Sequence, residues 1–107
     1  MRRTLLDEQV PRALARELGA GVECVQDRGW AGLTNGELLR AAAGAGFEVF
    51  ITMDRNLRFQ QNLQQYALGV ILVRAPTNRL SDLRPLVADI AAGMATVAPG
   101  QLVHVGA

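Results

Sequence analysis

Residues 4–11, TLLDEQVP, run a short apolar stretch directly into an acid, and residues 50–56, FITMDRN, repeat that pattern. A strand that ends beside Asp7 and another that ends just before Asp54 would each carry a carboxylate at the carboxyl end. Carboxylates resist burial unless a partner compensates their charge. These two stretches therefore indicate two strands of the fold and a candidate functional site at their carboxyl ends.

Apolar strand-like runs alternate with helix-like segments along the whole chain, with Thr34 and Ser81 as expected N-caps. Regular alternation with short connections predicts a parallel sheet covered by helices on both faces. Right-handed crossovers favour a three-layer α/β/α sandwich whose five-stranded, mainly parallel sheet has the order 2-1-3-4-5. We expect strands over residues 2–6, 22–25, 48–52, 69–74 and 101–105, and helices over residues 11–20, 34–46, 56–67 and 81–94.

In this strand order the first and third strands are neighbours and flank the point where the winding reverses. Ligands of doubly wound sheets bind in the crevice beyond the carboxyl ends of the strands at that point. We therefore expect Asp7 and Asp54 to converge on one crevice.

Length and composition narrow the classes of function. The 107 residues suggest one domain over 1–107, and the net charge of +1 gives no general attraction for nucleic acid. All eleven basic residues are arginines, which excludes any mechanism that needs a lysine amine. The single Cys24 and single His104 exclude an internal disulfide and zinc sites built from Cys and His. Neither a membrane-spanning run nor a signal peptide is visible, so we expect a cytoplasmic protein without a membrane partner.

Four acids are candidate functional residues, and each also has a structural interpretation. If Asp7 were a helix N-cap, Pro11 would clash with the carbonyl group of Asp7, so Asp7 has no capping task. Glu37 follows Thr34 at capping-box spacing, which leaves its role open. Asp54 competes with Asn56 for one helix cap, and the remaining acid, Glu8, either points into solvent or supports the site.

Several carboxylates in one crevice repel each other unless a cation or a proton neutralises them. Oxygen ligands without His or Cys suit Mg²⁺ or Mn²⁺, which can activate water for phosphodiester cleavage. Three arginines are candidates for holding substrate phosphates, with an ordinary solvated surface as the alternative. They are Arg28, Arg55 and Arg58.

The segments LLDEQVP, TNGELL and FITMDRN together resemble the small PIN-like domains of the DUF5615 type, which are relatives of toxin ribonucleases in bacterial toxin–antitoxin pairs. This resemblance, over nearly the whole chain, implies a metal-dependent ribonuclease. Its partners would be an RNA substrate and a cognate antitoxin protein, with a homodimer also compatible. Asp7, Glu37 and Asp54 would be the catalytic metal ligands, and Glu8 an accompanying acid. The family often has a second Asp where this chain has Asn56, which can ligate a metal through its carbonyl but brings no charge.

Two other functions are compatible with the sequence. A phosphoacceptor receiver domain fits the spacing of Asp7, Glu8 and Asp54, but such domains need a lysine that this chain lacks. A PIN-like fold without catalytic activity, serving as a protein-interaction module, is compatible with Asn56 and with the nearly neutral charge.

Overall fold

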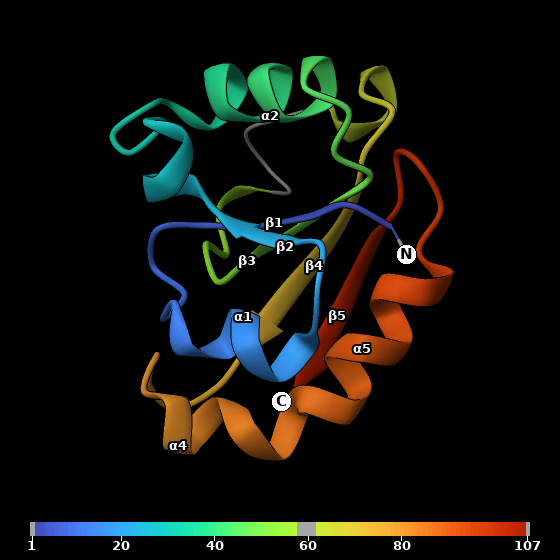
Figure 1. Cartoon of the computed structure of the whole chain (residues 1–107). Coiled ribbons are helices and arrows are strands. Elements are labelled where there is room, and N and C mark those ends of the chain that lie inside the picture. Colours follow the sequence, from blue (N-terminus) through green and yellow to red (C-terminus); the bar gives the residue numbers. More distant parts are fainter. Residues whose placement is uncertain (1, 58–61, 107) are drawn as a thin grey trace.

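The structure is a computed structural model that describes residues 2–57 and 62–106 (Figure 1). Its sheet has five strands in the order β2-β1-β3-β4-β5, and every neighbouring pair is parallel, which confirms the expected architecture and winding. The strands are β1 (Thr4–Leu6), β2 (Val22–Cys24), β3 (Val49–Thr52), β4 (Gly69–Arg74) and β5 (Leu102–Gly106).

Helices cover both faces of the sheet and make a three-layer sandwich. In Figure 1, α2 (Asn35–Gly44) lies on one side of the sheet, with α1 (Ala13–Leu18), α4 (Leu80–Leu83) and α5 (Val87–Thr96) on the other. Successive side chains of a strand point to opposite faces. Leu6 therefore packs in the core beneath α1 and α5, whereas its neighbour Leu5 packs in the core beneath α2.

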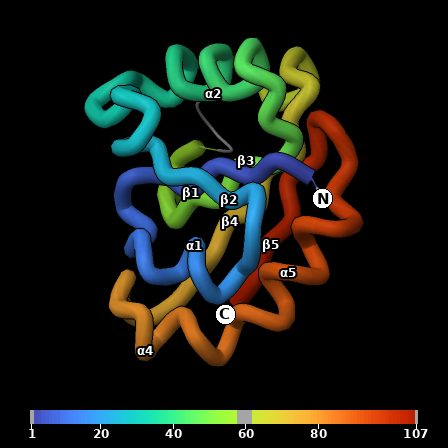
Figure 2. The backbone as a smooth tube through the Cα atoms, in the orientation of Figure 1, coloured from blue at the N-terminus to red at the C-terminus, as the bar shows by residue number. Residues whose placement is uncertain are grey.

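The strand register places the two expected acids at one edge of the sheet. Leu6 of β1 pairs with Ile51 of β3, and Thr52 pairs with Leu72 of β4. Asp7, the residue after β1, therefore lies level with Thr52, the last residue of β3. The smooth trace in Figure 2 shows β5 beside α5 at the end of the chain, and β5 pairs only with β4 as an outer strand.

The start of α2 agrees with its sequence signature. Thr34 is the N-cap, its hydroxyl accepts a hydrogen bond from the backbone N–H of Glu37, and the Glu37 carboxylate accepts one from the Thr34 N–H. This reciprocal pair satisfies two donors that the helix leaves unpaired. The predicted cap is therefore confirmed.

The prediction of one continuous helix over residues 56–67 was wrong in its second half. Leu57 is helical and the next four residues lie outside the described part, but Asn62 is extended and caps a separate 3₁₀ turn, Leu63–Gln65. The Asn62 side chain accepts a hydrogen bond from the Gln64 N–H at 3.3 Å. Such a local side-chain bond offers the backbone an alternative to the helix.

The segment 81–94 also differs from the single helix that was predicted. Helix α4 begins at Leu80, and its N-cap position is occupied by Arg79, whose side chain makes no capping hydrogen bond. The predicted cap, Ser81, lies inside the helix. Pro85 lies in a 3₁₀ turn, Arg84–Leu86, that separates α4 from α5. Proline lacks the N–H that a continuous helix requires, which explains the break.

Within residues 2–57 and 62–106, every helix is too short or too polar to cross a bilayer. Between β2 and α2 the chain forms a 3₁₀ turn, Val25–Arg28, and then continues irregularly to the cap of α2.

Candidate functional site

Asp7 follows β1 directly and is almost completely buried, with 6% of its surface exposed. Its backbone N–H donates to the carbonyl of Ile51 on β3 at 2.9 Å. Its carboxylate accepts two hydrogen bonds, from the Thr52 hydroxyl to Oδ2 at 2.7 Å and from the Glu8 N–H to Oδ1 at 2.8 Å. Helix α1 begins six residues later, at Ala13, so Asp7 does not cap it, as predicted.

Burial raises the pKa of Asp7 above its ordinary value. The hydrogen bonds from Thr52 and from the Glu8 N–H lower the pKa, and the carboxylates of Glu8 and Asp54 raise it again. Burial is the largest of these contributions because a carboxylate removed from water loses hydration that two hydrogen bonds only partly replace. The result is a carboxyl group that any nearby cation would stabilise in its charged form.

Asp54 is tied to Asp7 through Thr52. The Thr52 hydroxyl donates to Asp7 and accepts from the Asp54 N–H at 3.1 Å, so one buried side chain bridges the ends of both acidic stretches. Asp54 Oδ1 accepts from the Asn56 N–H at 3.0 Å, and Oδ2 accepts from Asn35 Nδ2 at 3.1 Å. Because Asn35 is the first residue of α2, that helix begins beside the site.

Glu8 is exposed and orders the loop that leads to α2. Its Oε1 accepts from the Gly32 N–H at 3.3 Å, and its backbone carbonyl accepts from Gln26 Nε2 at 3.3 Å. Its charge reaches Asp7, since it contributes to the raised pKa of that group. Glu8 is thus close to the site while its carboxylate is engaged by the loop.

Glu37 is held in the capping box. Its Oε1 accepts from both the N–H and the hydroxyl of Thr34, at 3.0 and 2.9 Å. These bonds lower the pKa of Glu37, which is exposed. The structural interpretation therefore accounts for the position of this side chain, and its role as a metal ligand stays a prediction.

The oxygens of Asp7 and Asp54 fit a hard divalent cation in part. Each of the four carboxylate oxygens accepts one hydrogen bond from the described residues, and a carboxylate oxygen has two lone pairs, so each can still serve as a ligand. Across residues 2–57 and 62–106, however, no group of three or more His, Cys, Asp or Glu side chains is arranged to hold a metal ion. The described residues thus present two carboxylates, with Asn56 exposed beside them.

The three arginines that were expected to bind phosphate have different surroundings. The Arg28 guanidinium lies 4.9 Å from the Trp30 ring centroid and forms an ion pair with Glu23 at 3.4 Å, which accounts for its position structurally. Arg55 lines a cavity at the same edge of the sheet as the acids. Arg58 lies outside the described residues.

Two residues that connect the acids had no role in the sequence analysis. Thr52 lies in the segment FITMDRN and Asn35 in the segment TNGELL, but neither residue was predicted to contact an acid. A hydroxyl residue two positions before Asp54, at the end of an apolar strand, was the available signal for Thr52. Nothing in the local sequence indicates that Asn35 would reach Asp54, 19 residues away.

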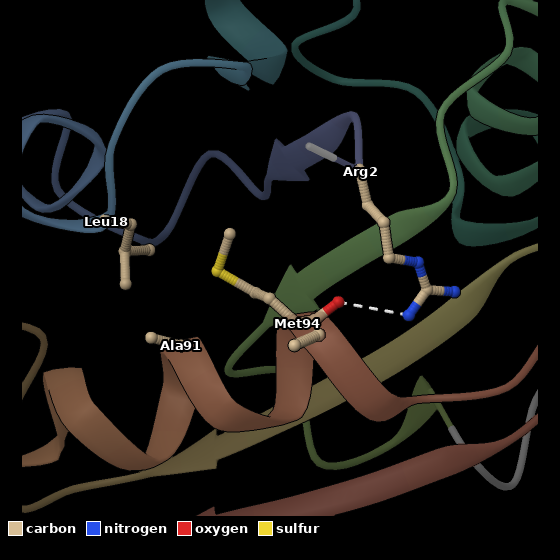
Figure 3. A pocket seen from close by; sticks show the side chains of 5 residues that line it. Arg2, Leu18, Ala91 and Met94 are labelled. Atoms are coloured by element: carbon tan, nitrogen blue, oxygen red, sulfur yellow. Dashed lines mark hydrogen bonds between the residues drawn. The ribbon is translucent and has the colours of Figure 1, made fainter.

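A separate cavity of about 380 Å³ lies away from the acids, between the ends of α1 and α5 (Figure 3). Its wall is mostly apolar, from Leu18, Ala91, Met94 and Ala95. The fifth lining residue, Arg2, donates from Nη1 to the Met94 carbonyl at 3.0 Å, as the dashed line shows. This cavity carries no carboxylate or nucleophile, so the acidic pair remains the candidate site.

Comparison with protein-family models, with curated proteins and with solved structures finds no match to this chain.

Proposed function

We propose that this protein is a metal-dependent phosphodiesterase that cleaves RNA, with Asp7 and Asp54 at its centre. The observation that carries the proposal is the buried Asp7 carboxylate, linked through the Thr52 hydroxyl to Asp54 at the carboxyl edge of two neighbouring parallel strands. Carboxylates are rarely buried without a compensating charge. A divalent cation between the two acids would supply that charge.

In this proposal the chain's own residues hold and orient the ligands. Thr52 fixes Oδ2 of Asp7, and Asn35 fixes Oδ2 of Asp54, so both carboxylates are positioned before any ligand arrives. When bound, Mg²⁺ or Mn²⁺ would lower the pKa of a water molecule and stabilise the leaving oxygen of a phosphodiester. The raised pKa of Asp7 makes it easy to protonate when no cation is present.

The choice of RNA as substrate is supported by the resemblance of the three acidic segments to PIN-like domains of the DUF5615 type. The same resemblance supports a bacterial toxin–antitoxin setting, with a cognate antitoxin as partner and the cytoplasm as location. The substrate, the partner and the location are proposed from this resemblance, whereas the geometry supports the paired acids at a ligand-binding edge of the sheet.

The first test is calorimetric titration of Mn²⁺ into the wild type, Asp7→Asn and Asp54→Asn, followed by cleavage of single-stranded RNA. We expect binding in the wild type and its loss in both variants, together with the loss of cleavage. Asp89→Asn is the matched control, because Asp89 is exposed in the first turn of α5, a helix that contacts β4 and β5. Unchanged cleavage by the double variant Asp7→Asn, Asp54→Asn would refute the proposal.

A specific observation also favours a second candidate, an interaction module without catalysis. Glu37 is hydrogen-bonded to Thr34, and among the described residues no group of three acids is arranged to hold a metal. Asp7 and Asp54 would therefore offer a metal ion only two negative charges. A protein that binds no Mn²⁺ at millimolar concentration and cleaves no RNA would support this candidate instead.

A further inference from the structure

A second cavity, of about 350 Å³, opens at the carboxyl edge of the sheet beside the acidic pair. Two arginines from successive strand ends line it: Arg74 is the last residue of β4, and Arg55 follows β3. The rest of its lining includes Pro76, Pro85 and Asp82. The cavity thus combines rigid, largely apolar walls with two guanidinium groups.

Arg74 lacks the partners that a partly buried arginine normally has. Its Nε is buried and makes no hydrogen bond, and its guanidinium forms no ion pair within residues 2–57 and 62–106. A buried charged donor without an acceptor is unfavourable. Arg74 also lines the adjoining cavity, so an anion held there would give its guanidinium group a charged partner.

The other charges around the cavity leave it net positive. Arg55 is exposed and has no ion pair to the described part of the chain. The one acid, Asp82, accepts a hydrogen bond from the Thr77 hydroxyl and is not paired with either arginine. The residues that line the cavity thus carry two arginine charges and one carboxylate, a formal excess of one positive charge.

The position of the cavity relative to the acids fits a strand of nucleic acid. Asp7 follows β1, and Arg74 ends β4, which is two places along in the order β1-β3-β4. Neighbouring strands are about 4.8 Å apart, so the two strand ends are separated by roughly 10 Å. A short segment of one nucleic-acid strand can therefore reach from the acids to the cavity.

We propose that the cavity lined by Arg55 and Arg74 binds a backbone phosphate of the RNA strand whose scissile phosphodiester lies at Asp7 and Asp54. The guanidinium fork matches the oxygens of a phosphate group, and Pro76 and Pro85 form part of the cavity wall beside the two arginines. The identity of the strand as RNA rests on the proposed function, whereas phosphate binding follows from the arginine cavity itself.

The test is a binding experiment in EDTA, so that neither metal binding nor cleavage contributes. A fluorescently labelled short single-stranded RNA is titrated with the wild type, Arg74→Gln, Arg55→Gln and the control Arg16→Gln. Arg16 is exposed on α1, so this control removes one positive charge without touching the cavity. Circular dichroism and thermal unfolding establish that each variant is folded before its affinity is compared.

We expect about tenfold weaker binding for Arg74→Gln, a smaller loss for Arg55→Gln, and no change for Arg16→Gln. The slope of log affinity against log salt should fall by about 0.7 when the Arg74 contact is lost. Asp82→Asn should bind more tightly, because it removes the one negative charge of the cavity. Equal affinity and equal salt slope in folded Arg74→Gln and wild type would overturn the proposal.

Two further arms separate this inference from the proposed catalysis. RNA binding that persists in Asp7→Asn, Asp54→Asn but weakens in Arg74→Gln supports the cavity even if no cleavage is ever found. Competition by inorganic phosphate at the same site identifies a phosphate group as the ligand. If inorganic phosphate binds in an Arg74-dependent way and the RNA does not bind, the assignment to an RNA strand is refuted.

Discussion

Replacing Asp7 by Asn should make the folded protein more stable at neutral pH while removing the candidate function. Asp7 is 6% exposed, and within the described part of the chain its carboxylate receives two hydrogen bonds, from Thr52 and from the Glu8 N–H. An Asn side chain keeps an oxygen that can accept from the Glu8 N–H. It also removes the buried charge and its repulsion with the carboxylates of Glu8 and Asp54.

The pH dependence gives the sign of the effect. Burial raises the pKa of Asp7 above its unfolded value of 3.8, so the folded state binds more protons in the interval between the two values. Stability from this group is therefore highest below pH 3.8 and falls as the pH rises towards the folded pKa. The free energy of unfolding of Asp7→Asn does not fall in this way. The variant should therefore be more stable than the wild type above pH 3.8, and still so at pH 7.

We expect the free energy of unfolding to rise by about 1 kcal/mol at pH 7, a size typical of single stabilising substitutions. For a domain of this size that corresponds to a rise in Tm of about 4–8 °C. The assay is urea unfolding of the wild type and Asp7→Asn at several pH values between 3 and 8, in EDTA. Asp89→Asn, at an exposed position, is the control. A variant that is less stable than the wild type at pH 7 would show that the Asp7 hydrogen bonds outweigh its desolvation.

Three further changes test other parts of the structure. Glu37→Gln should leave Tm nearly unchanged, since Gln can also complete a capping box, whereas Thr34→Ala should cost about 1 kcal/mol in urea unfolding. Weaker Mn²⁺ binding by Glu37→Gln would identify Glu37 as a ligand, and unchanged Mn²⁺ binding would leave it with the capping role alone. Gly69→Ala should cost roughly 1–3 kcal/mol in the same assay, because the new Cβ would lie 2.7 Å from Val97 Cγ1. Thr52→Val should cost roughly 1–3 kcal/mol and weaken Mn²⁺ binding measured by calorimetry, because it deletes the bridge between the two acids; an unchanged Mn²⁺ affinity would contradict its positioning role.

The sequence by itself determined the architecture and the edge at which the acids lie. Alternating apolar runs and helical segments specify a parallel sheet, and handedness then leaves few strand orders, among them the expected and observed one. Strand ends and caps depend on a few adjacent residues, which is why Asp7 at the end of β1 and Thr34 before α2 were predicted. Local patterns also failed where a short-range side-chain bond competed with a helix, as at Asn62.

Only the tertiary structure decided which of these residues meet. Thr52 and Asp7 are 45 positions apart, and Asn35 and Asp54 are 19 apart, yet each pair is hydrogen-bonded. Such contacts depend on strand register and on where each loop returns the chain, and no local periodicity encodes these distances. The same holds for Arg74, whose neighbouring cavity exists because β4 lies beside β3 and the turn before α5 closes over the strand end.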